Sequence, residues 1–229
     1  MLKIDNIDLY YGASQALKKV SFEAEKGKVA CVMGRNGVGK TSLMRAVAGQ
    51  HPVQSGTILW DGKDISKQPP YERAKNGIAY VPQGRLVFGP LTVEENIAAG
   101  LEATGRRKIP GDIYDLFPVL RDMRRRKAGN LSGGQQQQLA IARALAADPK
   151  VLLLDEPTEG IQPSIIKDLA KTLNEIKRTR QISIVVSEQV LSFATAVADR
   201  MLVLDKGKIA HEAAGEDIDA KQISRYLTV

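Results

Sequence analysis

The sequence predicts an α/β fold, with a core of mainly parallel sheet, an N-terminal antiparallel β-subdomain and an inserted helical subdomain. Three observations support this prediction. The apolar run 29–33 has strand character and leads through a glycine-rich turn into a helical segment. Residues 86 to about 150 change to a mostly helical pattern, and an apolar strand followed by a helix returns from Val151 onward.

The composition fits one globular domain that spans residues 1–229. The chain is 43% hydrophobic and 26% charged, which is ordinary for a soluble globular protein. Its start, Met1–Asp5, is not a secretory signal, and no apolar run approaches the length of a membrane span, so we expect a cytosolic location. The single cysteine, Cys31, excludes an internal disulfide and is expected in the core.

The net charge of +7 is concentrated in residues 101–130, which carry eight Lys/Arg against four Asp/Glu. The densest runs are Arg106–Lys108 and Arg124–Lys127. Three interpretations stay open: a solvated helical face, contact with anionic lipid or a membrane-embedded partner, and nucleic-acid binding. The third is disfavoured because no aromatic residues alternate with the charges.

The N-terminal quarter mixes antiparallel strands with one parallel-type strand. Residues 2–7 alternate as a half-buried strand, and 16–24 form a second strand pattern that turns into 29–33. After the first helix, 57–60 is a strand ending at the turn Asp61-Gly62, and 78–81 is a buried-strand run.

The remaining elements follow the pattern of an interrupted parallel sheet. Thr92–Ile97 has the composition of a capped helix start. A Pro at 118 breaks the helical segment 112–120. The further expected elements are helices at 136–147, 163–179, 192–200 and 220–227, strands at 151–156 and 182–186, and a hairpin at 201–210.

The turn after the strand 29–33 has the phosphate-loop pattern G-x-x-x-x-G-K-T. Its glycines let several backbone N–H groups converge on a phosphate at a helix N-terminus. We expect Lys40 to reach the β- and γ-phosphates of ATP and Thr41 to hold Mg²⁺. An ordinary glycine-rich turn is disfavoured, because all four fixed positions match the phosphate-loop pattern and the flanking segments have the expected strand and helix character. The expected nucleotide-binding residues here are Gly34, Arg35, Asn36, Gly37, Val38, Gly39, Lys40, Thr41 and Ser42.

The strand 151–156 ends in two acids, Asp155 and Glu156. A buried strand beside the phosphate loop would deliver Asp155 to Mg²⁺ and place Glu156 to polarise an attacking water. The alternative is a plain acidic turn after a strand. We therefore predict that Lys40 and Glu156 are catalytic residues of a nucleotide triphosphatase.

A third segment, Leu131–Gln135, begins a helix with a hydroxyl and two glycines, which makes an anion-binding end. With this segment added, the whole chain resembles an ABC-type ATPase, a P-loop NTPase. The resemblance implies that Tyr11 stacks on adenine and that Gln83 touches Mg²⁺. It also implies that two cassettes pair head-to-tail as an ATP-dependent dimer. The segment of one cassette would then cover ATP held by Lys40 of the other, through Ser132, Gly133, Gly134 and Gln135.

Two positions depart from that family's usual pattern. Gln162 stands where an Asp is common, and Gln189 stands where a switch histidine is common. Gln189 is the expected γ-phosphate contact and third catalytic residue, with Glu188 or a residue of the partner as the open alternatives. The only histidines, at 51 and 211, are expected on the surface.

Several segments narrow the resemblance to the branched-chain amino acid importer ATPases: 33–40, 81–85, 131–139, 155–165 and 188–189. Within that group, the four-glutamine run and residues 159–166 look most like the urea-importer branch. The resemblance implies two membrane-spanning permease subunits, a second ABC ATPase, a periplasmic solute-binding protein and a peripheral position at the cytoplasmic face of the inner membrane. The expected cofactors are ATP and Mg²⁺.

Two rival functions are weaker. A soluble ABC ATPase acting on DNA would need a long coiled-coil insertion, yet Lys40 and Leu131 are only 91 positions apart. The ribosome-acting type carries two cassettes in one chain, whereas this chain has one. A simple P-loop kinase would not need the segment Leu131–Gln135.

Overall fold

A six-stranded sheet forms the centre of the molecule. The computed structural model describes residues 1–227. The strand order is β10-β9-β3-β8-β7-β6, and every neighbouring pair is parallel except β9 with β10. The strands are β3 (Val29–Met33), β6 (Ile78–Val81), β7 (Val151–Asp155), β8 (Ser183–Glu188), β9 (Arg200–Asp205) and β10 (Lys208–Ala214).

A second, antiparallel sheet comes from the N-terminal part of the chain. Its order is β2-β1-β4-β5, with β1 pairing antiparallel to both β2 and β4. This confirms the predicted antiparallel subdomain, although β1 runs further than the expected 2–7. The bounds are β1 (Leu2–Tyr11), β2 (Ser14–Ala24), β4 (Ser55–Trp60) and β5 (Lys63–Asp64).

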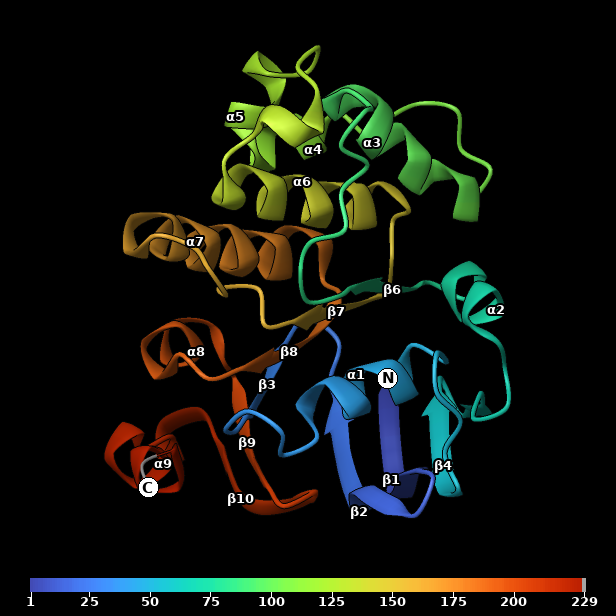
Figure 1. The fold of residues 1–229 in the computed structure, drawn as a ribbon, viewed down its shortest axis with the longest axis vertical. Helices are drawn as coiled ribbons and strands as arrows, with labels where there is room; N and C mark the ends of the chain where they lie inside the picture. The colour runs from blue at the N-terminus through green and yellow to red at the C-terminus, as the bar shows by residue number, and fades with distance from the viewer. Residues whose placement is uncertain (228–229) are drawn as a thin grey trace.

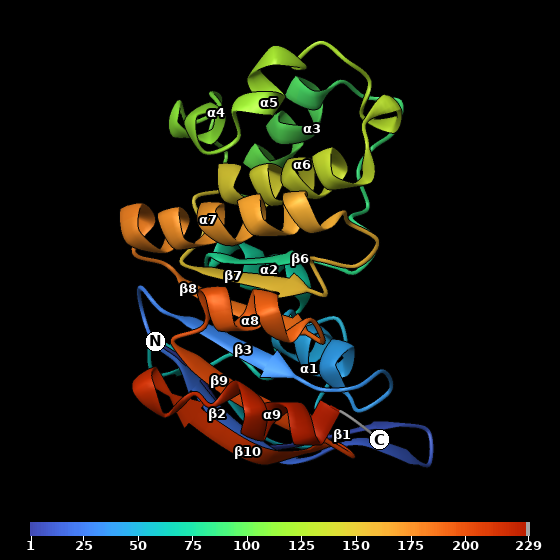
Figure 2. The ribbon, with the colours of Figure 1, turned by 90° about the vertical axis from the view of Figure 1, so that its left-hand side faces the viewer.

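Helices cover the central sheet and form a separate layer at one end of the molecule. Between β6 and β7, the helices α3 to α6 stack beyond α7, as Figures 1 and 2 show. The first helix, α1, instead lies between the two sheets. The helices are α1 (Lys40–Val47), α2 (Pro70–Lys75), α3 (Val93–Ala99), α4 (Asp112–Leu116), α5 (Pro118–Asp122), α6 (Gly133–Ala146), α7 (Pro163–Arg180), α8 (Leu191–Val197) and α9 (Ala220–Leu227), with short 3₁₀ turns at Gly100–Ala103, Ala128–Asn130 and Gly215–Asp217.

Strand β3 shows how the core is divided. Its alternate residues face opposite sides of the sheet. Val29, Cys31 and Met33 join the cluster that contains α6, α7 and α8. Ala30 and Val32 join the cluster that contains α1 and the antiparallel sheet. The strand is therefore buried on both faces, as parallel strands in α/β proteins are, and Cys31 is a fully buried core residue as predicted.

The structure adds one helix that was not expected and shortens another. The short helix α2 was not predicted; its buried Arg73 donates to the carbonyls of Ala46 and Val47 at the end of α1, a contact between segments far apart in sequence. The helix expected over 192–200 ends at Val197, because the chain must turn there for Arg200 to pair with β3. Both histidines are partly exposed.

The predicted fold class is confirmed, including the helical insertion between β6 and β7. The assignment of all 229 residues to a single nucleotide-binding domain stays a prediction. Among the described residues, no helix is both long enough and apolar enough to cross a bilayer.

Candidate nucleotide site

Four loops meet at one edge of the parallel sheet. β3 ends at Met33, β6 at Val81, β7 at Asp155 and β8 at Glu188, and these strands are parallel neighbours in the order β3-β8-β7-β6. The carboxyl ends of such strands are where ligands bind in open α/β sheets. The register therefore brings the phosphate loop, the acidic pair, the segment after Val81 and the turn before α8 to the same place.

The phosphate loop has backbone geometry that only glycine adopts easily. Gly37 and Gly39 have φ of 79° and 114°, in the left-handed region. A Cβ on Gly39 would lie 2.7 Å from the carbonyl oxygen of Ala16, and one on Gly34 would lie 2.6 Å from that of Leu204. The loop is thus pressed against β2 and β9, and Gly39 begins α1 without a side-chain cap.

Lys40 is the buried centre of the loop. Its side chain is 3% exposed, and Nζ donates to the carbonyls of Gly34 at 2.7 Å and Arg35 at 2.9 Å. Nζ also lies 2.9 Å from Oε1 of Glu156, whose side chain is 7% exposed. The structure therefore joins two of the three predicted catalytic residues, Lys40 and Glu156, in one buried ion pair.

Asp155 lies beside this pair, at the end of β7. Its Oδ1 accepts from Thr41 at 3.2 Å and from Ser187 at 2.5 Å, and Oδ2 accepts from the Tyr80 hydroxyl at 3.1 Å. Burial, with the adjacent Asp155 carboxylate, raises the pKa of the Tyr80 hydroxyl. Tyr80 therefore stays a neutral donor that orients the carboxylate.

The donor set beside the phosphate loop fits Mg²⁺. Thr41 and Asp155 offer hard oxygen ligands within hydrogen-bond distance of each other, and Mg²⁺ prefers oxygen. Gln83 is exposed on the segment after β6, and its Nε2 donates to Glu159 at 3.1 Å, which leaves its Oε1 to act as an acceptor.

A cleft of about 590 Å³ opens over these groups. Tyr11 lines this cleft and is 42% exposed, and its ring centre lies 4.4 Å from that of His51 with the two rings inclined at 65°. Lys18 and Lys206 also line the cleft, two cations that the sequence analysis did not single out. The predicted residues that line the cleft are Tyr11, Gly37, Val38, Gly39, Lys40, Thr41, Ser42, Gln83 and Glu156.

The predicted segment Ser132–Gln135 does not line this cleft within the described residues. Ser132 caps α6 by accepting from the Gln135 backbone N–H at 3.3 Å, while the Gln135 side chain accepts from the Ser132 N–H at 2.9 Å. Gly133 and Gly134 lie in the first turn of the same helix. The helix N-terminus is therefore preformed within the helical layer, away from the phosphate loop of its own chain.

Gln189 occupies the turn between β8 and α8 and is exposed. Its backbone N–H donates to Oε2 of Glu188 at 2.7 Å, and its side chain is not among those lining the cleft in the described part of the chain. Gln162 precedes α7 without capping it through its side chain. The role of Gln189 as the γ-phosphate contact therefore stays a prediction, and Gln162 had no predicted role.

Sequence reasoning gave no role to Ser187 and offered Glu188 only as an alternative phosphate sensor. Ser187 is fully buried and joins the acidic pair, since Oγ donates to Asp155 and accepts from the backbone N–H of Glu156 at 3.1 Å. Glu188 is 1% exposed, accepts from backbone and hydroxyl donors, and is not among the described residues that line the cleft. The signal that could have found both is their place at the end of a buried strand.

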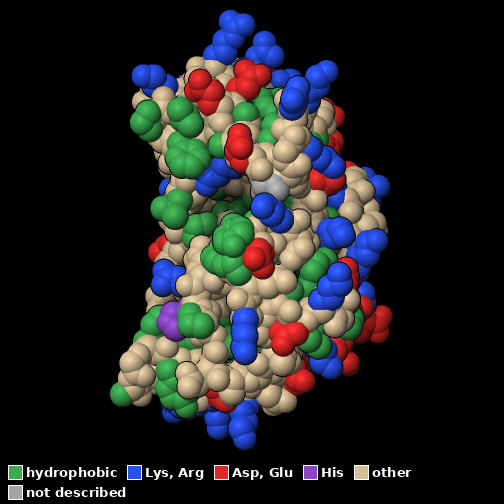
Figure 3. Space-filling view, turned by 90° about the vertical axis from the view of Figure 1, so that its right-hand side faces the viewer, with side chains coloured by type: hydrophobic (Ala, Val, Ile, Leu, Met, Phe, Trp, Pro, Cys, Tyr) green, Lys and Arg blue, Asp and Glu red, His purple; other side chains and the backbone are tan. Residues whose placement is uncertain are grey.

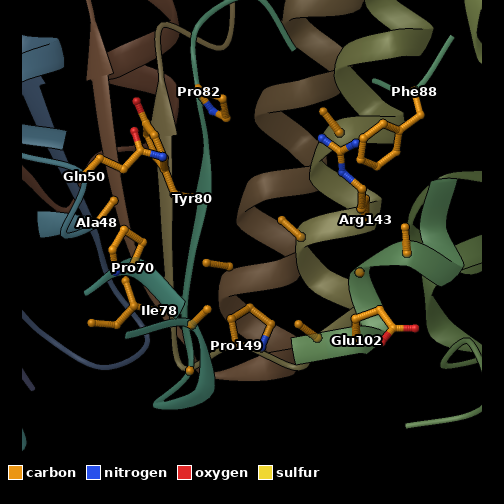
Figure 4. A pocket seen from close by; sticks show the side chains of 18 residues that line it. Ala48, Gln50, Pro70, Ile78, Tyr80, Pro82, Phe88, Glu102, Arg143 and Pro149 are labelled. Carbon is orange, nitrogen blue, oxygen red and sulfur yellow. The ribbon is translucent and has the colours of Figure 1, made fainter. Parts of the chain in front are cut away.

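A second concavity, which we call the α2 groove, lies between α2, β6 and the helical layer. Its volume is about 480 Å³. Figure 3 faces the side of the molecule that bears α2 and shows hydrophobic side chains around a hollow. Figure 4 shows Phe88 stacked beside Arg143, whose guanidinium carbon is 4.9 Å from the ring centre. The groove also contains Tyr80, so one residue links it to Asp155.

Residues 17–159 match the model of the family described as ABC transporter. A curated relative from Pseudomonas aeruginosa, the high-affinity branched-chain amino acid transport ATP-binding protein BraG, is 39% identical and covers 94% of this chain and 93% of its own. The probable branched-chain amino acid transport ATP-binding protein LivF of Archaeoglobus fulgidus is 33% identical, with coverages of 95% and 94%.

Among solved structures, the chain is similar to the ADP conformation of an ATP-binding cassette of an ABC transporter. The sequence identity is 30% and the TM-score is 0.83, and the match covers 99% of this chain and 94% of that one. The similarity extends through both sheets and the helical layer, since almost the entire chain is matched.

Proposed function

The chain belongs to the ABC transporter family as an ATP-binding cassette with ATPase activity, and from that premise we propose that it powers an importer for a small polar solute. The solute class is either a branched-chain amino acid or urea or another short amide. The names of the two relatives support the first. The four-glutamine run and the segment around Gln162 support the second.

The buried pair of Lys40 and Glu156 is the observation that carries the chemistry. ATP binding redirects the Lys40 ammonium toward the β- and γ-phosphates, because this charge donor lies within the loop that cradles them. Glu156 then loses its cation and is left beside the γ-phosphate as a carboxylate able to polarise water. The ion pair therefore couples nucleotide binding to release of the base.

The Asp155 cluster holds the metal side of the site. Mg²⁺ held there would neutralise negative charge that develops on the phosphate oxygens during hydrolysis. Thr41, Asp155 and Gln83 are its proposed protein ligands. Ser187 and Tyr80 fix both oxygens of Asp155, so the carboxylate is oriented before nucleotide binds.

The site is completed by a second cassette in this proposal. Ser132–Gln135 of the partner would cover the γ-phosphate through a helix N-terminus whose cap is already formed. Gln189 is the proposed uncharged contact to the same phosphate. The second cassette belongs to an assembly with two permease subunits at the cytoplasmic face of the inner membrane, which receives solute from a periplasmic binding protein.

The α2 groove is the proposed docking site of the permease. It is apolar along α2 and β6, it carries the exposed Phe88, and its wall includes Arg143 as a charged contact. Tyr80 connects the groove to Asp155, and Gln83 follows on the same segment. Movement of a docked permease segment could therefore shift Tyr80 and Gln83, and through them the proposed metal ligands.

Reconstitution tests this function. We expect weak ATP hydrolysis by the purified chain, and a marked rise when the companion cassette and both permease subunits are added in vesicles with the solute-loaded binding protein. Labelled leucine and labelled urea, supplied in separate reactions, identify the solute. Full turnover by a dilute monomer, or stimulation by nucleic acid instead of the permease, would contradict the proposal.

A further inference from the structure

Glu188 is a buried acid that the reaction scheme above does not use. It ends β8, is 1% exposed, and lies outside both the cleft and the α2 groove. A buried carboxylate costs several kcal/mol unless it is hydrogen-bonded. An apolar residue would fill the same volume without that cost, so the hydrogen bonds of this carboxylate need an explanation.

Each oxygen of Glu188 binds a different segment. Oε1 accepts from the backbone N–H of Thr158 at 3.1 Å and from its hydroxyl at 2.5 Å. Oε2 accepts from the backbone N–H groups of Gln189 at 2.7 Å and Val190 at 2.9 Å. The carboxylate therefore connects the two segments. All four of these contacts are hydrogen-bond donors, as a charged carboxylate requires.

Both joined segments lie at the reacting end of the nucleotide site. Thr158 belongs to the turn that starts at Glu156, where Glu159 donates to the Glu156 carbonyl at 3.2 Å. Glu156 itself has φ of 46°, an uncommon conformation for a non-glycine residue, so the turn must be held from outside. Val190 is the N-cap residue of α8, and Gln189 precedes it in the loop that we propose contacts the γ-phosphate.

We propose that Glu188 is a positioning residue for ATP hydrolysis, locking the turn that bears Glu156 to the loop that bears Gln189. The two loops then move as one unit, and the water-polarising carboxylate keeps a fixed place relative to the γ-phosphate side of the site. This inference rests on the proposed role of Glu156. Glu188 acts only through its neighbours and does not touch the nucleotide.

Glu188→Gln is the informative variant, because an amide has one acceptor oxygen where the carboxylate has two. Whichever way the amide is turned, either the Thr158 segment or the Gln189 segment loses its hydrogen bonds. A small displacement of a catalytic group costs up to about 100-fold in rate. We therefore expect kcat to fall about 10- to 100-fold in the full chain, with affinity for a fluorescent ATP analogue unchanged within about twofold.

Thr158 supplies a milder pair of variants. Thr158→Val removes one hydroxyl donor and should lower kcat several-fold, whereas Thr158→Ser keeps the hydroxyl and should restore it. The double variant Glu188→Gln, Thr158→Val should lose less than the product of the single losses, because both act on one contact. Ser183→Ala, at the opposite end of β8 and equally buried, is the matched control and should leave kcat unchanged.

Glu156→Gln, measured in parallel, separates the two proposals. If Glu156→Gln abolishes hydrolysis but Glu188→Gln turns over like the wild type, the positioning role is wrong and the site stands. If Glu156→Gln hydrolyses normally, the assignment of the base fails, and the positioning role fails with it. If Glu188→Gln does not fold, the Thr158 pair decides: equal kcat for Val and Ser at that position would overturn the proposal.

Discussion

The nucleotide edge and the α2 groove differ in how their residues are held. At the nucleotide edge, Lys40, Asp155 and Glu188 are almost fully buried and bonded to several partners each. In the α2 groove, Phe88 is 49% exposed, and Tyr71, which follows the groove residue Pro70 on α2, is 62% exposed. The difference indicates that the nucleotide edge is preorganised for chemistry, and it is consistent with our proposal that the groove is covered by a partner protein.

Lys40→Ala is the change with the largest expected effect on this comparison, because it removes the central cation of the preorganised edge. ATP hydrolysis should fall about 10²- to 10³-fold, the loss typical of one positioned charge donor. The variant also leaves Glu156 buried without its cation, which lowers stability. Adding Glu156→Gln should therefore recover thermal stability but not hydrolysis.

The control for Lys40→Ala is Lys28→Ala, an exposed lysine that pairs with Glu25 on the surface. Surface pairs contribute little to stability, so this variant should behave like the wild type. Hydrolysis at the wild-type rate by Lys40→Ala would remove the phosphate-loop assignment, and the buried edge would then need another function.

Phe88→Asp tests the groove half of the comparison. A carboxylate placed beside Arg143 replaces an aromatic contact surface with a hydrated charge, so binding to the permease subunits should weaken about tenfold or more, as for loss of an interface anchor. Affinity for ATP should stay within about twofold. Tyr226→Asp, an exposed aromatic on the C-terminal helix, is the matched control. Unchanged assembly of Phe88→Asp with the permease would move the docking site elsewhere.

Substitutions of Gln189 should have the smallest effect on hydrolysis, since its side chain is exposed. Gln189→Ala should lower kcat of the assembled transporter several-fold and change ATP affinity less. Gln189→His should be tolerated and should add a pH dependence of kcat near the histidine pKa of roughly 6.5. An unchanged kcat in Gln189→Ala would exclude this residue as the phosphate contact.

The two regions also differ in how far the sequence predicts them. The phosphate loop and the pair Asp155-Glu156 are contiguous motifs, because a strand end and a glycine turn create each locally, and the structure brings them together as expected. The α2 groove combines residues from Ala48 to Pro149. No local pattern links them, and α2 itself depends on the distant contacts of Arg73.

The same reasoning explains what was missed or incomplete at the nucleotide edge. Ser187 and Glu188 gain their roles only when β8 is placed beside β7, a pairing of distant segments. The helix expected to reach Arg200 is ended early by that residue's pairing in the sheet. The role of Ser132–Gln135 stays a prediction, because it depends on a second chain.

The most direct test of the central claim is to measure binding and hydrolysis in Glu156→Gln. The account predicts that the variant, mixed with Mg²⁺ and ATP and passed through gel filtration, retains intact ATP and elutes as a dimer with its companion cassette. The rate of ATP hydrolysis in the same sample, measured as phosphate formed, should be at least about 100-fold lower than in the wild type, as for loss of a general base. Normal hydrolysis by Glu156→Gln, or loss of ATP binding together with hydrolysis, would contradict it.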